Sequence, residues 1–90
     1  MVPAQAKGLR AAVVVLRPGG VMDWHSTHAR EELLVALAGR VRVEVRSVHK
    51  LRRLTLKSGM CAFLPRQTLH RVVNRSPVRA RYLYVTAPTR

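Results

Sequence analysis

Acidic residues are scarce in this 90-residue chain, which has four Asp and Glu against 17 Lys and Arg and a formal net charge of +13. The positive electrostatic field of such a protein attracts polyanions, so nucleic acid has to be considered as a partner. The basic residues are scattered along the sequence, however, and aromatic residues that could stack on bases are few. The sequence therefore argues against nucleic-acid binding, although the charge alone leaves it open.

Cysteine occurs once, at Cys61. A single cysteine excludes an internal disulfide framework and a cysteine-based zinc site, and we expect Cys61 to be a small buried core residue. No apolar run reaches the roughly 18 residues that cross a bilayer. The first ten residues lack the apolar stretch of a signal peptide. Together these absences predict a cytoplasmic protein without membrane contact.

Hydrophobic residues make up 48% of the chain, which is enough for a packed core. We expect residues 9–90 to form one domain and residues 1–8 to form a flexible N-terminal arm. A chain this short buries only about 60–65% of its unfolded surface. A homodimer would help to stabilise it, and the apolar strand AAVVVL (residues 11–16) is the expected contact.

Short apolar segments separated by Gly and Pro predict an all-β fold. Residues 40–46 alternate, with three valines on one face and Arg40, Arg42, Glu44 and Arg46 on the other, charged face. Further strands are expected at residues 9–17, 51–57, 60–64, 70–74 and 78–88. In residues 51–57, Leu54 and Leu56 should both point inward.

Residues 29–39 (AREELLVALAG) can be interpreted in two ways. Ala, Leu and Glu are strong helix formers, and Gly39 would suit the end of a helix. Against a helix, residues 33–38 are apolar without interruption and leave no polar stripe for solvent, and the flanking segments are β. The pattern alone favours a strand but leaves the helix open.

Two spaced motifs decide between these interpretations. Gly59, Pro65, His70 and Asn74 have the spacing of the second motif of the cupin superfamily, except that Gln67 stands where that motif has a second glycine. Gly20, Glu32 and Gly39 match positions of the first motif. The chain therefore resembles a small single-domain cupin with a degenerate first motif. The resemblance implies a jelly-roll-like barrel, the double-stranded β-helix of cupins, in which Glu32 lies on a strand.

The chain departs from the family at the histidines of the first motif, because it has HSTH in place of His-x-His. In one register His25 is the first histidine and Thr27 takes the second position. In the other, Ser26 takes the first position and His28 is the second histidine. Strand alternation does not point both histidines inward unless a bulge intervenes. We prefer the register with His25.

By resemblance, His25, Glu32 and His70 would bind a divalent transition metal such as Fe, Mn, Ni or Zn, and His28 is the candidate for a fourth ligand. Thr27, Arg66, Gln67 and Tyr82 are the expected pocket residues, and Tyr84 shares a strand face with Tyr82. Trp24 should point away from His25. His49 lies in a polar turn and should be exposed.

The function that the resemblance implies is a metal-binding cupin that acts on or senses a small polar ligand. The basic surface favours an anionic ligand. Two alternatives remain: a metal-free degenerate cupin that serves as a binding or dimerisation module, and a basic nucleic-acid-binding domain. Because a fold does not fix a function, the sequence leaves open whether the protein is an enzyme.

Overall fold

The computed structural model describes residues 7–89, and these form eight β-strands and no helix. In chain order the strands are β1 (Arg10–Leu16), β2 (Val21–Ser26), β3 (Arg30–Ala38), β4 (Arg40–Arg46), β5 (Leu51–Lys57), β6 (Cys61–Leu64), β7 (Leu69–Val73) and β8 (Ala80–Pro88). The all-β prediction is confirmed. The structure shows residues 30–38 as a strand, so the helical interpretation of that segment is wrong.

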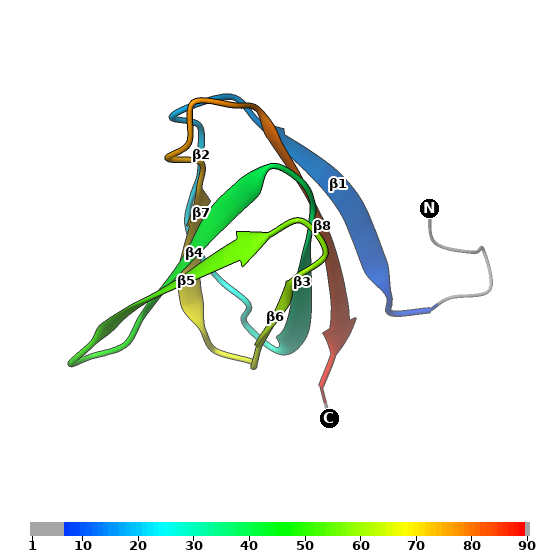
Figure 1. The fold of residues 1–90 in the computed structure, drawn as a ribbon. Coiled ribbons are helices and arrows are strands. Elements are labelled where there is room, and N and C mark those ends of the chain that lie inside the picture. Colours follow the sequence, from blue (N-terminus) through cyan, green and yellow to red (C-terminus); the bar gives the residue numbers. More distant parts are fainter. Residues whose placement is uncertain (1–6, 90) are drawn as a thin grey trace.

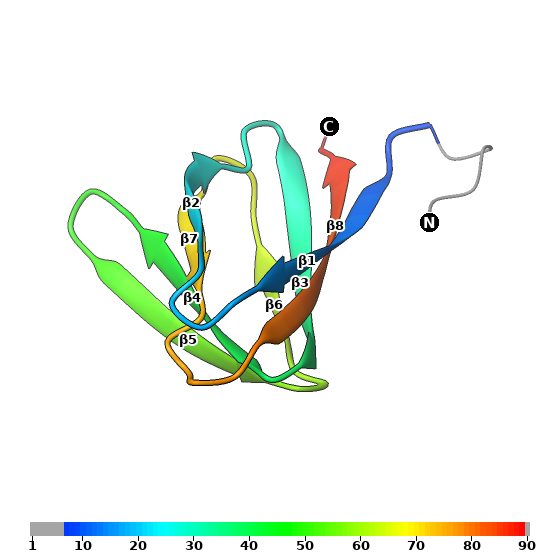
Figure 2. The same ribbon diagram turned by 90° about the horizontal axis from the view of Figure 1, so that it is seen from above.

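The strands form two antiparallel four-stranded sheets that face each other (Figures 1 and 2). Sheet A has the order β1-β8-β3-β6, and sheet B has the order β2-β7-β4-β5. The core lies between them and includes Leu34 of β3, Val43 of β4, Val72 of β7 and Tyr82 of β8. This arrangement is the jelly-roll-like barrel that the motifs predict.

Alternation along β3 explains why a helix-prone sequence forms a strand. Glu32, Leu34 and Ala36 are buried, whereas Leu33 and Leu37 point outward and are partly exposed. The outer surface of this strand is therefore apolar as well, which accounts for the uninterrupted apolar run. The apolar pattern does not predict β2, because VMDWHS mixes polar and apolar residues. Pairing with β7 stabilises this segment as a strand.

Gly39 makes the tight connection between β3 and β4. Its φ is +69°, and a Cβ atom there would lie 2.8 Å from the carbonyl oxygen of Arg79. Only glycine fits both the backbone conformation and this close approach. The residue that would end a helix thus ends a strand instead.

Asn74 ties the β1–β2 connection to the β7–β8 connection. Its Nδ2 donates to the carbonyl oxygens of Leu16, Arg17 and Val78 at 2.8–3.3 Å, and its Oδ1 accepts hydrogen bonds from the backbone N–H and the hydroxyl of Ser76. The side chain is 1% exposed. The last position of the second motif therefore holds the end of the barrel together rather than lining the site.

The prediction that Cys61 is buried is wrong, and two further side chains lie on the predicted faces but differ from expectation in exposure. Leu54 shares the inner face with Val43 but is 47% exposed, because the β4–β5 hairpin extends beyond the rest of the barrel (Figures 1 and 2). Cys61 is exposed because it lies on the outer surface of sheet A, paired with Val35. Glu44 does lie on the outer surface of sheet B, yet it is buried beneath Arg side chains from neighbouring strands.

Most of the expected N-terminal arm, namely residues 1–6, lies outside the described residues. At its end, the carbonyl oxygen of Gly8 accepts a hydrogen bond from the guanidinium of Arg30. In residues 7–89 no helix is long and apolar enough to cross a membrane.

Candidate metal centre

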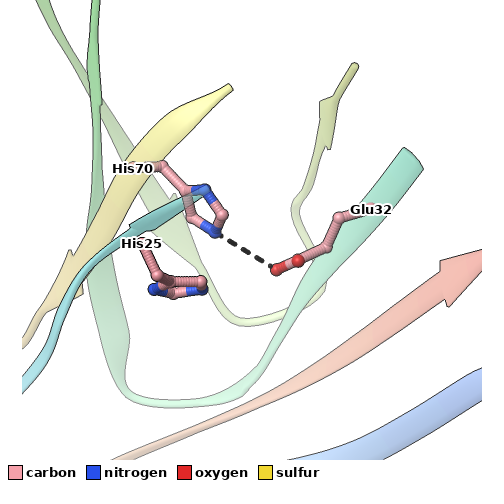
Figure 3. Close-up of side chains that lie close together, drawn as sticks. All are labelled: His25, Glu32 and His70. Carbon is pink, nitrogen blue, oxygen red and sulfur yellow. Dashed lines mark ion pairs between the residues drawn. The ribbon is translucent and has the colours of Figure 1, made fainter. Parts of the chain in front are cut away.

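His25, Glu32 and His70 converge between the two sheets (Figure 3). His25 lies on β2 directly opposite His70 on β7, and Glu32 lies on β3 of the facing sheet. One potential ligand atom from each residue lies within 4.8 Å of the other two. A register shift between Met22 and His25 in the β2–β7 pair belongs to this arrangement, because it turns Trp24 outward and His25 inward.

Hydrogen bonds to the backbone set the tautomer of both imidazoles. Nδ1 of His25 lies 2.7 Å from the carbonyl oxygen of Asp23, and Nδ1 of His70 lies 3.2 Å from that of Thr68. A carbonyl oxygen only accepts, so each Nδ1 carries the proton it donates. In the neutral ring, Nε2 then has a free lone pair. The same kind of hydrogen bond orients metal-binding histidines in other proteins.

The inner end of the site contains an unpartnered nitrogen. Nε2 of His70 is 3.4 Å from a carboxylate oxygen of Glu32, yet it makes no hydrogen bond, and the His70 side chain is fully buried. The rings of His25 and His70 lie 4.2 Å apart between centroids. Glu32 and His70 are buried, and His25 is exposed at the adjoining cavity. Three electron-pair donors that face one another this closely repel unless a cation or a proton lies between them. Two imidazoles and one carboxylate with open positions suit a divalent transition metal.

A cavity of about 610 Å³ adjoins the three residues. Met22, Val72, Tyr82 and Tyr84 provide much of its apolar wall, and Arg10 and Arg30 are the cationic residues in its lining. Burial, and to a lesser extent the charge of Glu32, raises the pKa of Tyr82, so its hydroxyl stays protonated and can donate a hydrogen bond. The cavity is thus apolar with a few polar groups, as ligand pockets usually are.

The other expected site residues lie around this centre. Thr27 and His28 line the cavity, but His28 is exposed and is not among the three converging residues. The Thr27 hydroxyl donates to the carbonyl oxygen of Pro65 and accepts from the N–H of Thr68, which makes it a loop anchor. Arg66 and Gln67 are exposed and do not line the cavity.

Sequence reasoning missed Arg10, Arg30 and Thr86 as cavity residues. The signal for two of them was strand alternation. Arg30 shares a face of β3 with Glu32, and Thr86 shares a face of β8 with Tyr82 and Tyr84. Nε of Arg30 donates to the Thr86 hydroxyl at 2.9 Å, which fixes the guanidinium at the rim of the cavity.

Comparison with known families finds a match to the cupin domain over residues 12–86. No curated protein matches the sequence. Among solved structures, the protein TT1209 from Thermus thermophilus has 32% sequence identity and a TM-score of 0.82, with 93% of this chain and 76% of that one covered.

Two further solved structures show the range of proteins with this fold. An oxalate oxidase in complex with the substrate analogue glycolate has 20% identity and a TM-score of 0.83, covering 90% of this chain and 42% of its own. CENP-C of Drosophila melanogaster bound to CAL1 has 15% identity and a TM-score of 0.79, covering 86% and 60%. The chain thus spans less than two thirds of the length of these two proteins.

Proposed function

Because the chain belongs to the cupin family, we propose that His25, Glu32 and His70 bind a divalent transition metal and that the adjoining cavity binds a small anionic ligand. The observation that carries the proposal is the unpartnered Nε2 of His70, which faces the Glu32 carboxylate. With both Nδ1 atoms donating to carbonyl oxygens, the two Nε2 lone pairs and the carboxylate form one set of donors. Fe, Mn, Ni and Zn all accept this set.

The residues around the metal would orient the ligand. A bound metal would act as a Lewis acid toward an oxygen of the ligand. Arg10 and Arg30 supply positive charge at the cavity rim, and Arg30 is held in place by Thr86 and Gly8. The protonated hydroxyl of Tyr82 can donate to the ligand, and the apolar wall can contact an apolar part of it. This arrangement favours a small carboxylate or similar anion with a short apolar part.

Metal content of single variants tests the proposal. Protein purified without added metal or chelator should contain a divalent metal by elemental analysis. His70→Ala and Glu32→Ala should lose it most completely and His25→Ala next, because each removes one of three ligands. His28→Ala should retain nearly all the metal and serves as the matched control, since it removes a histidine from the same loop region.

Two outcomes would contradict this ligand set. Loss of metal from His28→Ala but not from His25→Ala would show that the first motif uses the other register. Absence of metal in the unmodified protein after dialysis against Fe, Mn, Ni and Zn salts would overturn the metal site. Circular dichroism of each variant would show that the loss is not caused by unfolding.

The second candidate function is a metal-free binding module. A doubly protonated His70 would form an ion pair with Glu32 at the observed 3.4 Å, so a proton can replace the metal in balancing the carboxylate. A cupin neighbour that binds a protein, CENP-C with CAL1, supports this class of function. Metal analysis separates the two candidates.

We also propose that the chain forms a homodimer through β1 and the outer surface of sheet A. β1 is an edge strand, and the outer surface of its sheet exposes Val13, Val15, Leu33, Leu37 and Phe63 at 37–59%. A contiguous apolar surface and an unpaired strand edge are both features that association covers. A cytoplasmic location stays a prediction from the sequence.

A further inference from the structure

Basic side chains that are scattered in the sequence gather on the outer surface of sheet B. Strand alternation and register place six of them there, on three adjacent strands: Arg40, Arg42 and Arg46 of β4, Arg53 and Lys57 of β5, and Arg71 of β7. Glu44 is the only acidic residue on these three strands. The fold thus concentrates positive charge on one surface, whereas the opposite outer surface, that of sheet A, is largely apolar.

The single carboxylate of these three strands has all its partners within this surface. Glu44 is 1% exposed and accepts hydrogen bonds from Nε of Arg71 and Nε of Arg53, the latter at 3.2 Å. Arg42 lies 3.7 Å from the same carboxylate. Three guanidinium groups surround one carboxylate, so the surface keeps a surplus of positive charge even at its most acidic point.

Trp24 holds two of the guanidinium groups in place. The guanidinium carbon of Arg71 lies 4.8 Å from the centroid of the indole ring, and that of Arg46 lies 5.7 Å from it. These cation–π contacts restrict side chains that would otherwise move freely. Ordered cations lose less conformational entropy when they bind an anion.

Two neighbouring hollows share Arg75 at the edge of this surface. The first has a volume of about 270 Å³ and is lined by Arg40, Val41, Arg42, Thr55, Arg75 and Ser76, so Val41 is its only apolar residue. The second has a volume of about 280 Å³, and its lining combines Arg71 and Arg75 with Gly19, Val21, Val73 and Asn74. Guanidinium groups match phosphate oxygens in bidentate geometry. Two such hollows side by side suit successive anionic groups of one polymer.

We propose that the outer surface of sheet B binds the phosphate backbone of a nucleic acid, independently of the metal centre. Repeated anion-binding positions fit a phosphodiester chain better than an isolated small anion. Arginine outnumbers lysine five to one among the six residues, which favours phosphate. The aromatic residue on this surface, Trp24, already contacts two guanidinium groups and is not free to stack on bases, so binding should not depend on sequence.

Fluorescence anisotropy with labelled DNA and RNA tests this proposal. The unmodified protein should bind single-stranded DNA, duplex DNA and RNA of about 20 nucleotides, with an affinity that falls steeply between about 50 and 200 mM salt. The double variant Arg40→Gln/Arg75→Gln removes cations that line the first hollow and spares the contacts of Glu44. It should weaken binding about tenfold and lower the salt slope by about two.

The matched control is Arg52→Gln/Arg66→Gln, which removes the same charge elsewhere: Arg66 lies in the β6–β7 turn, and Arg52 pairs with the inward-facing Val45 and so lies on the other face of β5. It should weaken binding less than about twofold. Equal loss in both double variants would overturn the proposal, since net charge alone would then explain binding. So would the absence of binding at about 50 mM salt, or competition by poly-glutamate as strong as that by unlabelled DNA, which would identify an acidic protein as the partner. Chelation of metals should leave DNA binding unchanged.

Discussion

At the scale of single residues, Gln67 occupies a backbone conformation that suits glycine. Its φ is +57°, and the cupin motif has glycine at this position. A non-glycine residue in the left-handed region costs about 1–2 kcal/mol. A change to glycine would remove that cost, but glycine also gives the unfolded chain more freedom, which offsets about 0.4–1 kcal/mol of the gain.

We therefore expect Gln67→Gly to raise the free energy of unfolding by about 0.5–1 kcal/mol, measured by urea denaturation. Gln67→Ala is the control, since alanine keeps the Cβ atom and should give no gain. A destabilised Gln67→Gly protein would contradict this assignment of strain and would show that the glutamine side chain makes a stabilising contact.

Asn74 should matter for stability and not for metal binding. Its side chain makes five hydrogen bonds that join the β1–β2 and β7–β8 connections. Asn74→Ala leaves buried carbonyl oxygens without donors, so we expect the free energy of unfolding to fall by about 3 kcal/mol. Urea denaturation measures this loss, and elemental analysis of the folded fraction should show unchanged metal content. Loss of metal at unchanged stability would assign Asn74 to the site instead.

The residue types of the candidate site could be proposed from sequence because motif spacing points to Glu32 and His70. The choice between His25 and His28 could not be made in the same way. It depends on the register shift between Met22 and His25, which turns Trp24 outward where Arg71 and Arg46 contact it. Those contacts join β2 to β4 and β7, and no local pattern records them.

At the scale of elements, the Glu44 carboxylate links β4 to β5 and β7 through Arg53 and Arg71. Burial would raise the pKa of Glu44, but its hydrogen bonds and ion pairs with these arginines outweigh burial and hold the pKa below the ordinary value. The sequence alternation located Glu44 on the right face of β4. It could not predict burial on that face, because the covering arginines come from other strands.

This lowered pKa gives a signed pH dependence. Ionised Glu44 stabilises the fold above the unfolded pKa of about 4.3, and the stabilisation is lost as the pH falls toward the lower folded value. Glu44→Gln should lower the free energy of unfolding at neutral pH by about 2 kcal/mol, since its arginine partners are partly exposed. It should also flatten the decline of stability in acid. Urea denaturation from about pH 3 to neutral pH measures both, with exposed Glu31→Gln as control; parallel profiles for all three proteins would contradict the prediction.

At the scale of the whole molecule, the apolar outer surface of sheet A should set the oligomeric state. Sedimentation at micromolar concentration should give a mass of twice 10.1 kDa. Val15→Glu places a charge at a side chain that is 53% exposed on that surface, and it should give monomers without unfolding the chain. Val48→Glu makes the same change in the β4–β5 turn, where Val48 is 92% exposed, and should remain dimeric. A monomeric unmodified protein would refute the homodimer.

The two sheets turn their outer surfaces in opposite directions (Figure 2). A pair of chains joined through the outer surface of sheet A would therefore carry its two arginine-rich surfaces at opposite ends. Such a dimer has two nucleic-acid-binding surfaces that face away from each other. It would therefore bridge two nucleic-acid strands instead of binding both sides of one segment. The dimer would then bind long strands more tightly than a single chain does, because its two sites are linked and the second binds at a high effective concentration, without any new contact. Light scattering should rise when long DNA is added to the unmodified protein but not when it is added to Val15→Glu.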